Sequence, residues 1–123
     1  MSKDARVYLA QMLERILRIE SYTWEGESSF LQNPLIQDAV IRNLEVIGEA
    51  AKRVPDEFRV QHPDIPWRAL TGFRDVLIHQ YEGVGLALVW SAVATSLPEL
   101  RQAIEAVLPP LDTLEREIGG EDE

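Results

Sequence analysis

Residues 33–55, NPLIQDAVIRNLEVIGEAAKRVP, are the stretch that decides the fold. Asn33 is a favoured N-cap residue, and Pro34 suits the first helical position because that position needs no backbone N–H donor. Between these residues and Pro55, apolar side chains recur at helical spacing, and charged side chains fill the opposite side. The pattern predicts one long amphipathic helix. Its apolar stripe is Ile36, Val40, Leu44, Ile47, Ala51 and Val54, and its polar side is Asp38, Arg42, Glu45, Glu49 and Lys52.

Helices are also predicted before and after this stretch. A one-sided helix runs from about Lys3 to about Tyr22, and the glycine and serines from Gly26 onward break it. Residues 54–67 carry three prolines and predict a compact connection with one helical turn, after which Pro66 starts a helix that continues to Tyr81. The apolar stripe of the first helix is Leu9, Leu13, Ile16 and Leu17.

A fourth helix, Leu86 to Ser96, is predicted to carry no charged residue at all. Pro98 then either kinks this helix or starts a shorter one that ends near Leu108, because proline disrupts a helix interior. The predicted fold is all-α, an up-and-down bundle of four main helices and a shorter C-terminal helix. The apolar side chains of the uncharged helix belong either to the bundle centre or to a subunit interface. We expect the protein to form a homodimer, because surplus apolar surface is usually buried in an oligomer.

Composition narrows the possible classes of protein. The chain has 123 residues, no cysteine and a formal net charge of -9. Disulfides and thiolate metal sites are therefore excluded, and the acidity is unusual for a nucleic-acid binder. No signal-peptide core and no uncharged run long enough to cross a membrane are present, so we expect a cytoplasmic protein without membrane contact. Residues 1–110 are predicted to form one helical domain, followed by a flexible acidic tail, 111–123.

The stretch GFRDVLIHQYEG, residues 72–83, holds the candidate functional side chains. Arg74 and Tyr81 are seven positions apart and share a helix face, and Asp75 lies one turn before His79. His79 is displaced from Arg74 by roughly 140° around the helix axis. A second copy of the helix across a two-fold axis would bring two arginines and two histidines into one cleft.

Such a cleft suits metal-independent cleavage of RNA. Histidine can take the proton of the ribose 2′-OH or protonate the leaving 5′-oxygen, and arginine stabilises charge on the phosphate. Asp75 would orient His79 and favour its protonated form. The competing interpretation is that Arg74 and His79 are ordinary surface residues paired to carboxylates.

Other chemistries find less support. The chain lacks the paired Glu-x-x-His motifs of a di-iron bundle, a glycine-rich phosphate loop and a nucleophile beside a base. His62 is predicted to be a loop residue, and Glu45 and Glu49 a solvated or salt-bridged helix face. We expect no cofactor and no metal.

Three segments carry a resemblance to a known family. They are QDAVIRNLEVIGEAAKRVPDEFR at 37–59, HPDIPWRALTGFRDVLIHQYEGV at 62–84, and VW followed by LPEL up to Leu100. The chain resembles the HepT family of the HEPN superfamily, small toxins encoded beside an MntA-type minimal nucleotidyltransferase antitoxin. The family motif is Arg, four residues, His, one residue, Tyr.

The motif falls on Arg74, His79 and Tyr81. The resemblance implies a HEPN bundle, a homodimer whose cleft holds the arginine and histidine, and a metal-independent ribonuclease that cuts cellular RNA, either mRNA or tRNA. It further implies a type VII toxin–antitoxin pair in which the nucleotidyltransferase transfers AMP to Tyr81. An adenylated Tyr81 would place a bulky anion on the face of Arg74 and repel RNA. Asp75 replaces the asparagine frequent in relatives.

A different class of function stays open beside the ribonuclease. The same cleft could hold nucleotide or RNA without cleaving it, in a helical partner that regulates a nucleotidyltransferase. Cleavage lost in His79→Ala with folding retained would favour the ribonuclease, whereas binding without cleavage by the unaltered protein would favour the regulator.

Overall fold

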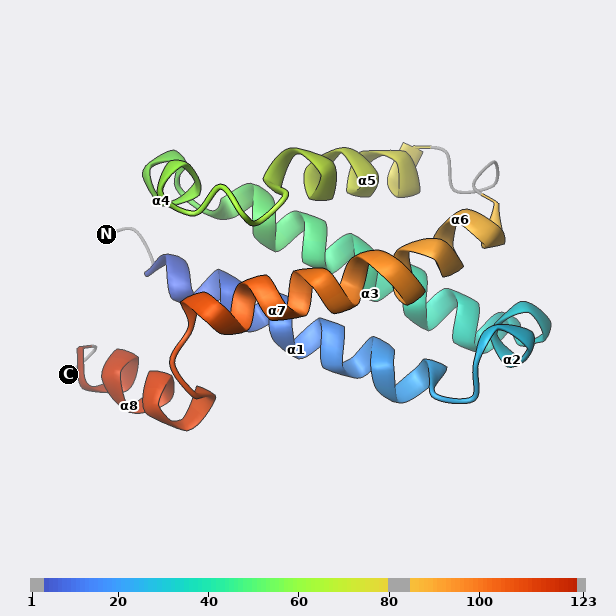
Figure 1. Ribbon diagram of the computed structural model, residues 1–123, viewed down its shortest axis with the longest axis horizontal. Helices are drawn as coiled ribbons and strands as arrows, with labels where there is room; N and C mark the ends of the chain where they lie inside the picture. Colours follow the sequence, from blue (N-terminus) through green and yellow to red (C-terminus); the bar gives the residue numbers. More distant parts are fainter. Residues whose placement is uncertain (1–3, 80–84, 122–123) are drawn as a thin grey trace.

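The computed structural model describes residues 4–79 and 85–121, and in both ranges the chain is helical with short connections and no strand. Four long helical stretches run up and down, and the last of them is continuous through three segments (Figure 1). The predicted all-α up-and-down bundle is confirmed. The long stretches are α1 (Ala5–Thr23), α3 (Pro34–Arg53), α5 (Trp67–His79), and α6 (Leu86–Ser91) with the π-helical segment η2 (Ala92–Ser96) and α7 (Leu97–Val107); the short helices are α2 (Glu27–Gln32), α4 (Asp56–Gln61) and the C-terminal α8 (Leu111–Glu121).

The ends of α3 follow the local chemistry of the sequence. The side chain of Asn33 accepts hydrogen bonds from the backbone N–H groups of Leu35, at 3.0 Å, and Ile36, at 3.4 Å. Pro34 occupies the first turn, and Val54 turns extended before Pro55, with ψ of 129°. The helix therefore begins and ends where the sequence predicts.

The N-terminal helix α1 differs from its prediction at one apolar position. Leu9, Leu13 and Ile16 are buried as expected, but Leu17 is 36% exposed. The side chains that complete the buried face are Met12 and Ile19. Leu17 lies about 100° around the helix from Ile16, at the edge of the buried face, so placing it in the core stripe was wrong.

The uncharged helix contributes to the core and to the surface. Val89 and Leu97 are buried, whereas Leu88 is 53% exposed. Pro98 does not end the helix, because the preceding residues Ala92–Ser96 widen into a π-helix and α7 continues from it. A π-helical turn changes the pattern of backbone hydrogen bonds, and such turns commonly occur where a regular α-helix is interrupted.

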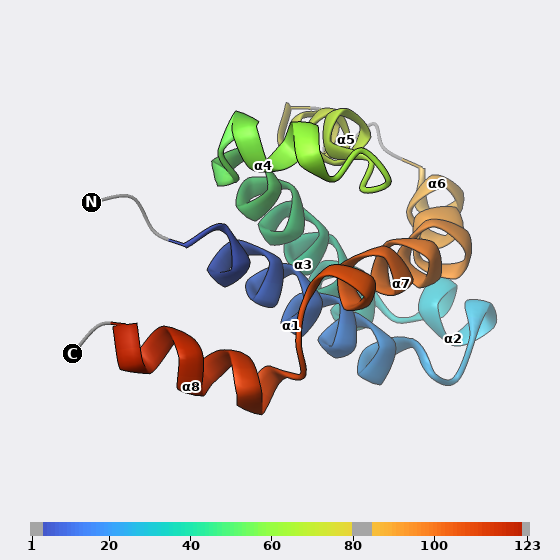
Figure 2. The ribbon, with the colours of Figure 1, turned by 60° about the vertical axis from the view of Figure 1, so that its left-hand side comes forward.

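Helix α3 lies between α1 and α5, and α7 lies along α1 (Figures 1 and 2). Phe30 of α2 is fully buried and contacts Trp90 of α6, with ring centroids 5.3 Å apart. The bundle therefore has one apolar core, to which α1, α3 and α6–α7 contribute most. Its fully buried large side chains include Leu9, Met12, Ile16, Ile19, Ile47, Leu77, Val89 and Ile104.

A helix occupies the region for which the sequence predicts only an acidic tail. The backbone N–H of Leu114 donates to the carbonyl of Pro110 at 2.9 Å, so the second proline of the pair starts α8. Leu114 is buried against α1, and Arg6 binds Glu117 at 2.8 Å. The predicted end of a helix near Leu108 is confirmed, since α7 ends at Val107, and the further helix α8 is what the sequence did not predict. The predicted flexibility of 111–123 stays a prediction.

Within the described ranges, none of the helices combines the length and the apolar character that crossing a membrane requires.

Candidate functional site

Helix α5 is anchored at its start by aromatic contacts. The indole N–H of Trp67 donates to the carbonyl of His62 at 3.0 Å. The ring of Phe58 lies over His62, with centroids 4.3 Å apart, and meets Trp67 edge-on at 6.5 Å. His62 thus sits at the end of α4 in the connection to α5, as predicted, and packs against an aromatic ring.

Arg74 occupies the middle of α5 where this helix crosses α3. Its side chain is 23% exposed, and its Nη1 donates to the Asp75 carboxylate at 3.1 Å. Its Nε is buried and has no acceptor among the described residues. A guanidinium binds phosphate through two parallel N–H donors, and in Arg74 these would be the Nη groups, because Nε is buried.

Asp75 is exposed, and its carboxylate is bound to Arg74. The sequence predicts that Asp75 orients His79, one turn further along. Pairing with the neighbouring arginine is the contact that the structure provides, and the orienting role stays a prediction.

His79 is the last residue of α5, five positions after Arg74 on a regular helix. Its backbone therefore has the angular offset from Arg74 that the sequence predicts. Tyr81, together with the predicted end of the helix there, lies outside the described residues.

The acidic residues of α3 are engaged in ion pairs. Glu45 binds Arg42 at 3.4 Å, and Glu49 binds Arg53 at 3.3 Å. The predicted salt-bridged face is confirmed. In residues 4–79 and 85–121, no group of three or more histidine or carboxylate side chains is placed to hold a metal ion.

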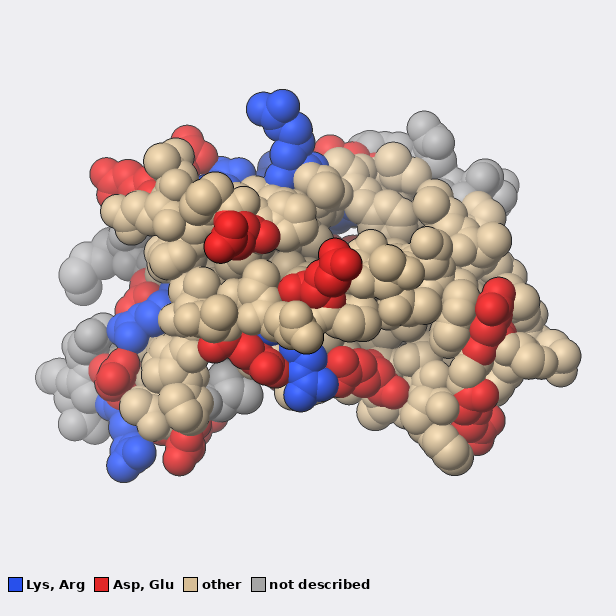
Figure 3. Space-filling view, in the orientation of Figure 1, with Lys and Arg blue, Asp and Glu red and all other residues tan. Residues whose placement is uncertain are grey.

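A cavity of about 520 Å³ separates α5 from the α6–α7 stretch. Figure 3 shows a hollow between these elements and an uncharged surface over α6. The lining is largely apolar, with two carboxylates. The lining residues include Leu70, Phe73, Leu88, Leu97, Asp64 and Glu99.

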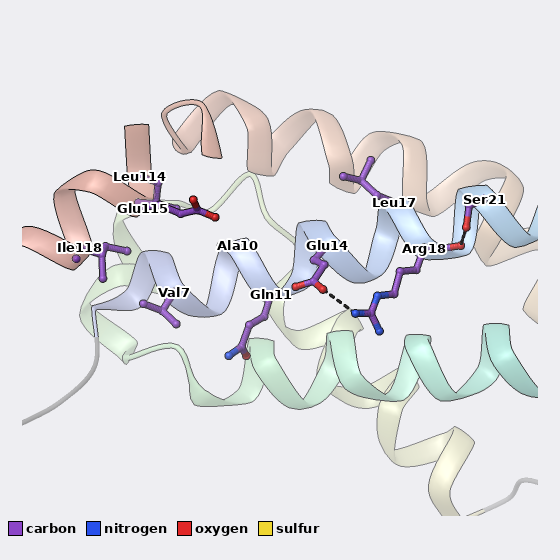
Figure 4. A pocket seen from close by; sticks show the side chains of 11 residues that line it. Val7, Ala10, Gln11, Glu14, Leu17, Arg18, Ser21, Leu114, Glu115 and Ile118 are labelled. Carbon is purple, nitrogen blue, oxygen red and sulfur yellow. Dashed lines mark hydrogen bonds and ion pairs between the residues drawn. The ribbon is translucent and has the colours of Figure 1, made fainter. Parts of the chain in front are cut away.

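A groove of about 820 Å³ lies between α1 and α8, on another side of the bundle. Val7 and Leu17 of α1 and Ile118 of α8 line it, and the Glu14–Arg18 ion pair, at 2.8 Å, lies along it (Figure 4). Neither this groove nor the cavity beside α5 includes Arg74 or Asp75 among its lining residues. A ligand of Arg74 would therefore approach from the surface of α5 instead of entering one of these two spaces.

A sequence model of the ribonuclease HepT-like family matches residues 12–107. The chain belongs to the ribonuclease HepT-like family. The matched range covers α3, α5 and α7 and contains Arg74, Asp75, His79 and Tyr81. Helix α8 follows it. The HepT resemblance carried by the sequence is thereby confirmed.

Several relatives cover nearly the whole HepT-like chain. A protein named probable ribonuclease HepT, from Thermococcus cleftensis, is 42% identical over 106 residues, 85% of this chain and 96% of that protein. A Methanocaldococcus jannaschii protein provisionally named an RNase is 38% identical over 122 residues, 98% of this chain and 95% of that protein.

A second relative from Methanocaldococcus jannaschii is longer. It is named a gamma-glutamylcyclotransferase and, provisionally, an RNase, and it is 43% identical over 113 residues, 91% of this chain. The HepT-like chain spans about half of it, 51% of its length. No solved structure matches the chain significantly.

One site residue escaped the sequence analysis. Gly48 lies in the middle of α3, is buried, and faces Arg74 across the crossing of α3 and α5. The available signal was a single glycine inside a strongly periodic helical stretch, since such a glycine costs helix stability and usually has a packing reason.

Proposed function

We propose that this protein is a metal-independent endoribonuclease and the toxin of a type VII toxin–antitoxin pair. Arg74 carries the proposal, because its side chain lies at the crossing of α3 and α5, is 23% exposed, and has only Nη1 engaged by a carboxylate among the described residues. The family membership and the names of the relatives support ribonuclease chemistry. The toxin–antitoxin pairing and the role of Tyr81 rest on the resemblance to the HepT family, and the roles of Arg74 and His79 also rest on their chemistry.

Arg74 binds the scissile phosphate. When the ribose 2′-oxygen attacks phosphorus, negative charge builds on the non-bridging oxygens. A guanidinium keeps its proton throughout and offers two donors to these oxygens. The Arg74 stem is held between α3 and α5, so little side-chain freedom is lost when phosphate binds.

His79 moves the protons of this reaction. One imidazole takes the proton of the 2′-OH as the new O2′–P bond forms, and one imidazolium gives a proton to the 5′-oxygen as the P–O5′ bond breaks. The products are a 2′,3′-cyclic phosphate and a free 5′-hydroxyl. No metal ion takes part in either transfer.

A second copy of the chain completes the site. Arg74 and His79 lie roughly 140° apart around one helix axis, so one α5 does not direct both at the same phosphate. Ile78, beside His79, is 41% exposed, and Leu88 of the uncharged α6 is 53% exposed. Burial of these apolar side chains would stabilise a homodimer with a shared cleft.

Tyr81 is the site of inactivation. An MntA-type nucleotidyltransferase attaches AMP from ATP to the phenol oxygen, with pyrophosphate as the leaving group. The added phosphodiester occupies the neighbourhood of Arg74 and repels RNA. The partner's surface would complement the acidic chain, whose net charge is -9.

One observation favours a second function. The Asp75 carboxylate already neutralises part of Arg74 at 3.1 Å, which suits a protein that binds RNA or nucleotide weakly and cuts nothing. In that case the chain is a helical partner that regulates the nucleotidyltransferase.

The deciding experiment incubates the purified protein with end-labelled cellular RNA in the presence of EDTA. The unaltered chain should cut the RNA, Arg74→Ala should lose on the order of 10²–10³-fold in rate, and His79→Ala about 10²–10⁴-fold. Arg68→Ala is the matched control, because it removes an exposed arginine from the same helix and should stay active. Intact RNA with the unaltered protein, together with measurable binding, would favour the regulator.

A further inference from the structure

We infer that Gly48 is a positioning residue for Arg74, since it lets α3 and α5 approach closely enough to place the guanidinium. This inference rests on the proposed function, because it concerns the phosphate-binding arginine of the ribonuclease site. Gly48 does not touch the substrate and acts only through Arg74.

The two helices approach so closely at this point that there is no room for a side chain on Gly48. A Cβ atom added to Gly48 would lie 2.3 Å from Cβ of Arg74 and 2.9 Å from the carbonyl oxygen of Leu70. It would also lie 3.0 Å from Cγ of Arg74. Favourable contacts between carbon atoms are about 3.5–4.0 Å, so no other residue fits at position 48 with α5 where it is.

Rotation of a side chain cannot relieve this overlap. The Cβ of Arg74 and the carbonyl of Leu70 both move only with the backbone of α5. Closely packed interiors transmit such an overlap to the neighbouring element. We expect Gly48→Ala to displace the middle of α5 from α3 by about 1 Å or more.

A displacement of this size matters more for Arg74 than for the fold. The stem of Arg74 leaves α5 directly at the crossing, and its Nε is buried there. The position of the guanidinium is therefore set by the separation of the two helices. A misplacement of about 1 Å at a catalytic site can cost on the order of 10²-fold in rate.

The sequence offers a matched control in Gly72, which lies two residues before Arg74 on α5. A Cβ added there would meet nothing within 4 Å. Gly48→Ala and Gly72→Ala make the same chemical change in neighbouring helices, and only the first one creates an overlap. We expect Gly48→Ala to lose about 10²-fold in kcat/KM for RNA, and Gly72→Ala to keep the rate of the unaltered protein.

A second background separates positioning from a general loss of folded protein. The readout is the affinity for an RNA with 2′-O-methyl groups, which cannot be cleaved, because a shift of α5 would also move His79 and change the cleavage rate. In Arg74→Ala there is no guanidinium to misplace, so adding Gly48→Ala should leave this affinity unchanged. A purely structural role would lower rate and affinity by the same factor in both backgrounds.

The possible results separate the inference about Gly48 from the proposed function. If Arg74→Ala is inactive and Gly48→Ala is as active as Gly72→Ala, the inference is overturned and the proposed function stands. If Arg74→Ala is fully active, the proposed function and the inference fall together. If Gly48→Ala does not fold while Gly72→Ala does, Gly48 serves the fold as a whole, and a separate role in positioning Arg74 is overturned.

Discussion

At the scale of single residues, Arg74 is paired with Asp75 and can exchange this carboxylate for a phosphate. Asp75 is more exposed than Arg74, with side-chain accessibilities of 55% and 23%. Water and salt therefore weaken the pair from the Asp75 side, and exposed pairs of this kind contribute little to stability. A phosphate that offers two oxygens to Arg74 is a stronger partner than one carboxylate oxygen.

Asp75→Asn should tighten RNA binding by roughly 2- to 5-fold, because it removes a negative charge that competes with phosphate for Arg74. The measurement is the dissociation constant for an RNA with 2′-O-methyl groups at fixed ionic strength. Asp64→Asn, which removes the same charge from an exposed residue just before α5 and leaves the pair intact, is the control for a change of surface charge.

The cleavage rate of the same variant tests the predicted orienting role of Asp75. If Asp75 holds His79, Asp75→Asn binds RNA more tightly and still cuts it more slowly. Equal rates for the variant and the unaltered protein would remove Asp75 from the catalytic residues. Weaker binding would contradict the competition between Asp75 and phosphate.

At the scale of elements, the start of α1 combines a local helix cap with a contact to the distant helix α8. Asp4 caps α1 by accepting from the backbone N–H of Arg6 at 2.8 Å, and its carboxylate also binds the Arg6 guanidinium at 2.7 Å. Arg6 in turn reaches Glu117 of α8. One residue therefore links the first and last helices of the described chain.

The hydrogen bond from the Arg6 side chain lowers the pKa of Asp4, outweighing the opposite effect of burial. A carboxyl group whose folded pKa is lowered stabilises the fold above its unfolded pKa, about 3.9, and loses that contribution as pH falls through the folded value. We expect the stability advantage of the unaltered protein over Asp4→Asn to be present at pH 6 and to be smaller at pH 3, because the folded pKa of Asp4 is lowered.

Urea unfolding at the two pH values measures this difference, and Asp4→Ala supplies the comparison. Asparagine still caps a helix, whereas alanine does not, so Asp4→Ala should cost about 1 kcal/mol in the free energy of unfolding relative to Asp4→Asn at either pH. A gap between the unaltered protein and Asp4→Asn that is the same at pH 3 as at pH 6 would show that the carboxylate charge is not the cause.

At the scale of the whole molecule, we propose a site that is shared by two chains. The described part of one chain holds Arg74 on the surface of α5, outside the cavity beside it and outside the groove on α1. A shared cleft would gather two arginines and two histidines, which makes the ribonuclease testable by mixing inactive variants.

Arg74→Ala and His79→Ala should complement each other. After the two variants are unfolded together and refolded, the mixed dimer has a cleft with one intact arginine and one intact histidine. We expect its cleavage rate to exceed that of either parent by at least about 10-fold, because each parent lacks one function completely. Separately tagged chains and tandem purification isolate the mixed dimer. Proven mixed dimers without a gain in rate would contradict the shared cleft.

How much of this protein follows from sequence depends on the scale. Asn33, Pro34 and Pro55 determine the limits of α3 through backbone chemistry within a few residues, and periodicity identifies the buried faces. The spacing of Arg74, His79 and Tyr81 matches the family motif and marks the proposed site. These are short-range patterns, complete within one or two helical turns.

The tertiary structure decided the features that depend on contacts between two helices. Leu17 is exposed because neighbouring helices leave the edge of α1 uncovered, and α8 is held by Leu114 and Arg6, which lie far apart in sequence. Gly48 acquires its role only where α3 crosses α5, since the overlap its Cβ would create is with atoms of another helix. Periodicity assigns a residue to a face of its own helix, whereas packing determines which backbone stands opposite it and at what distance.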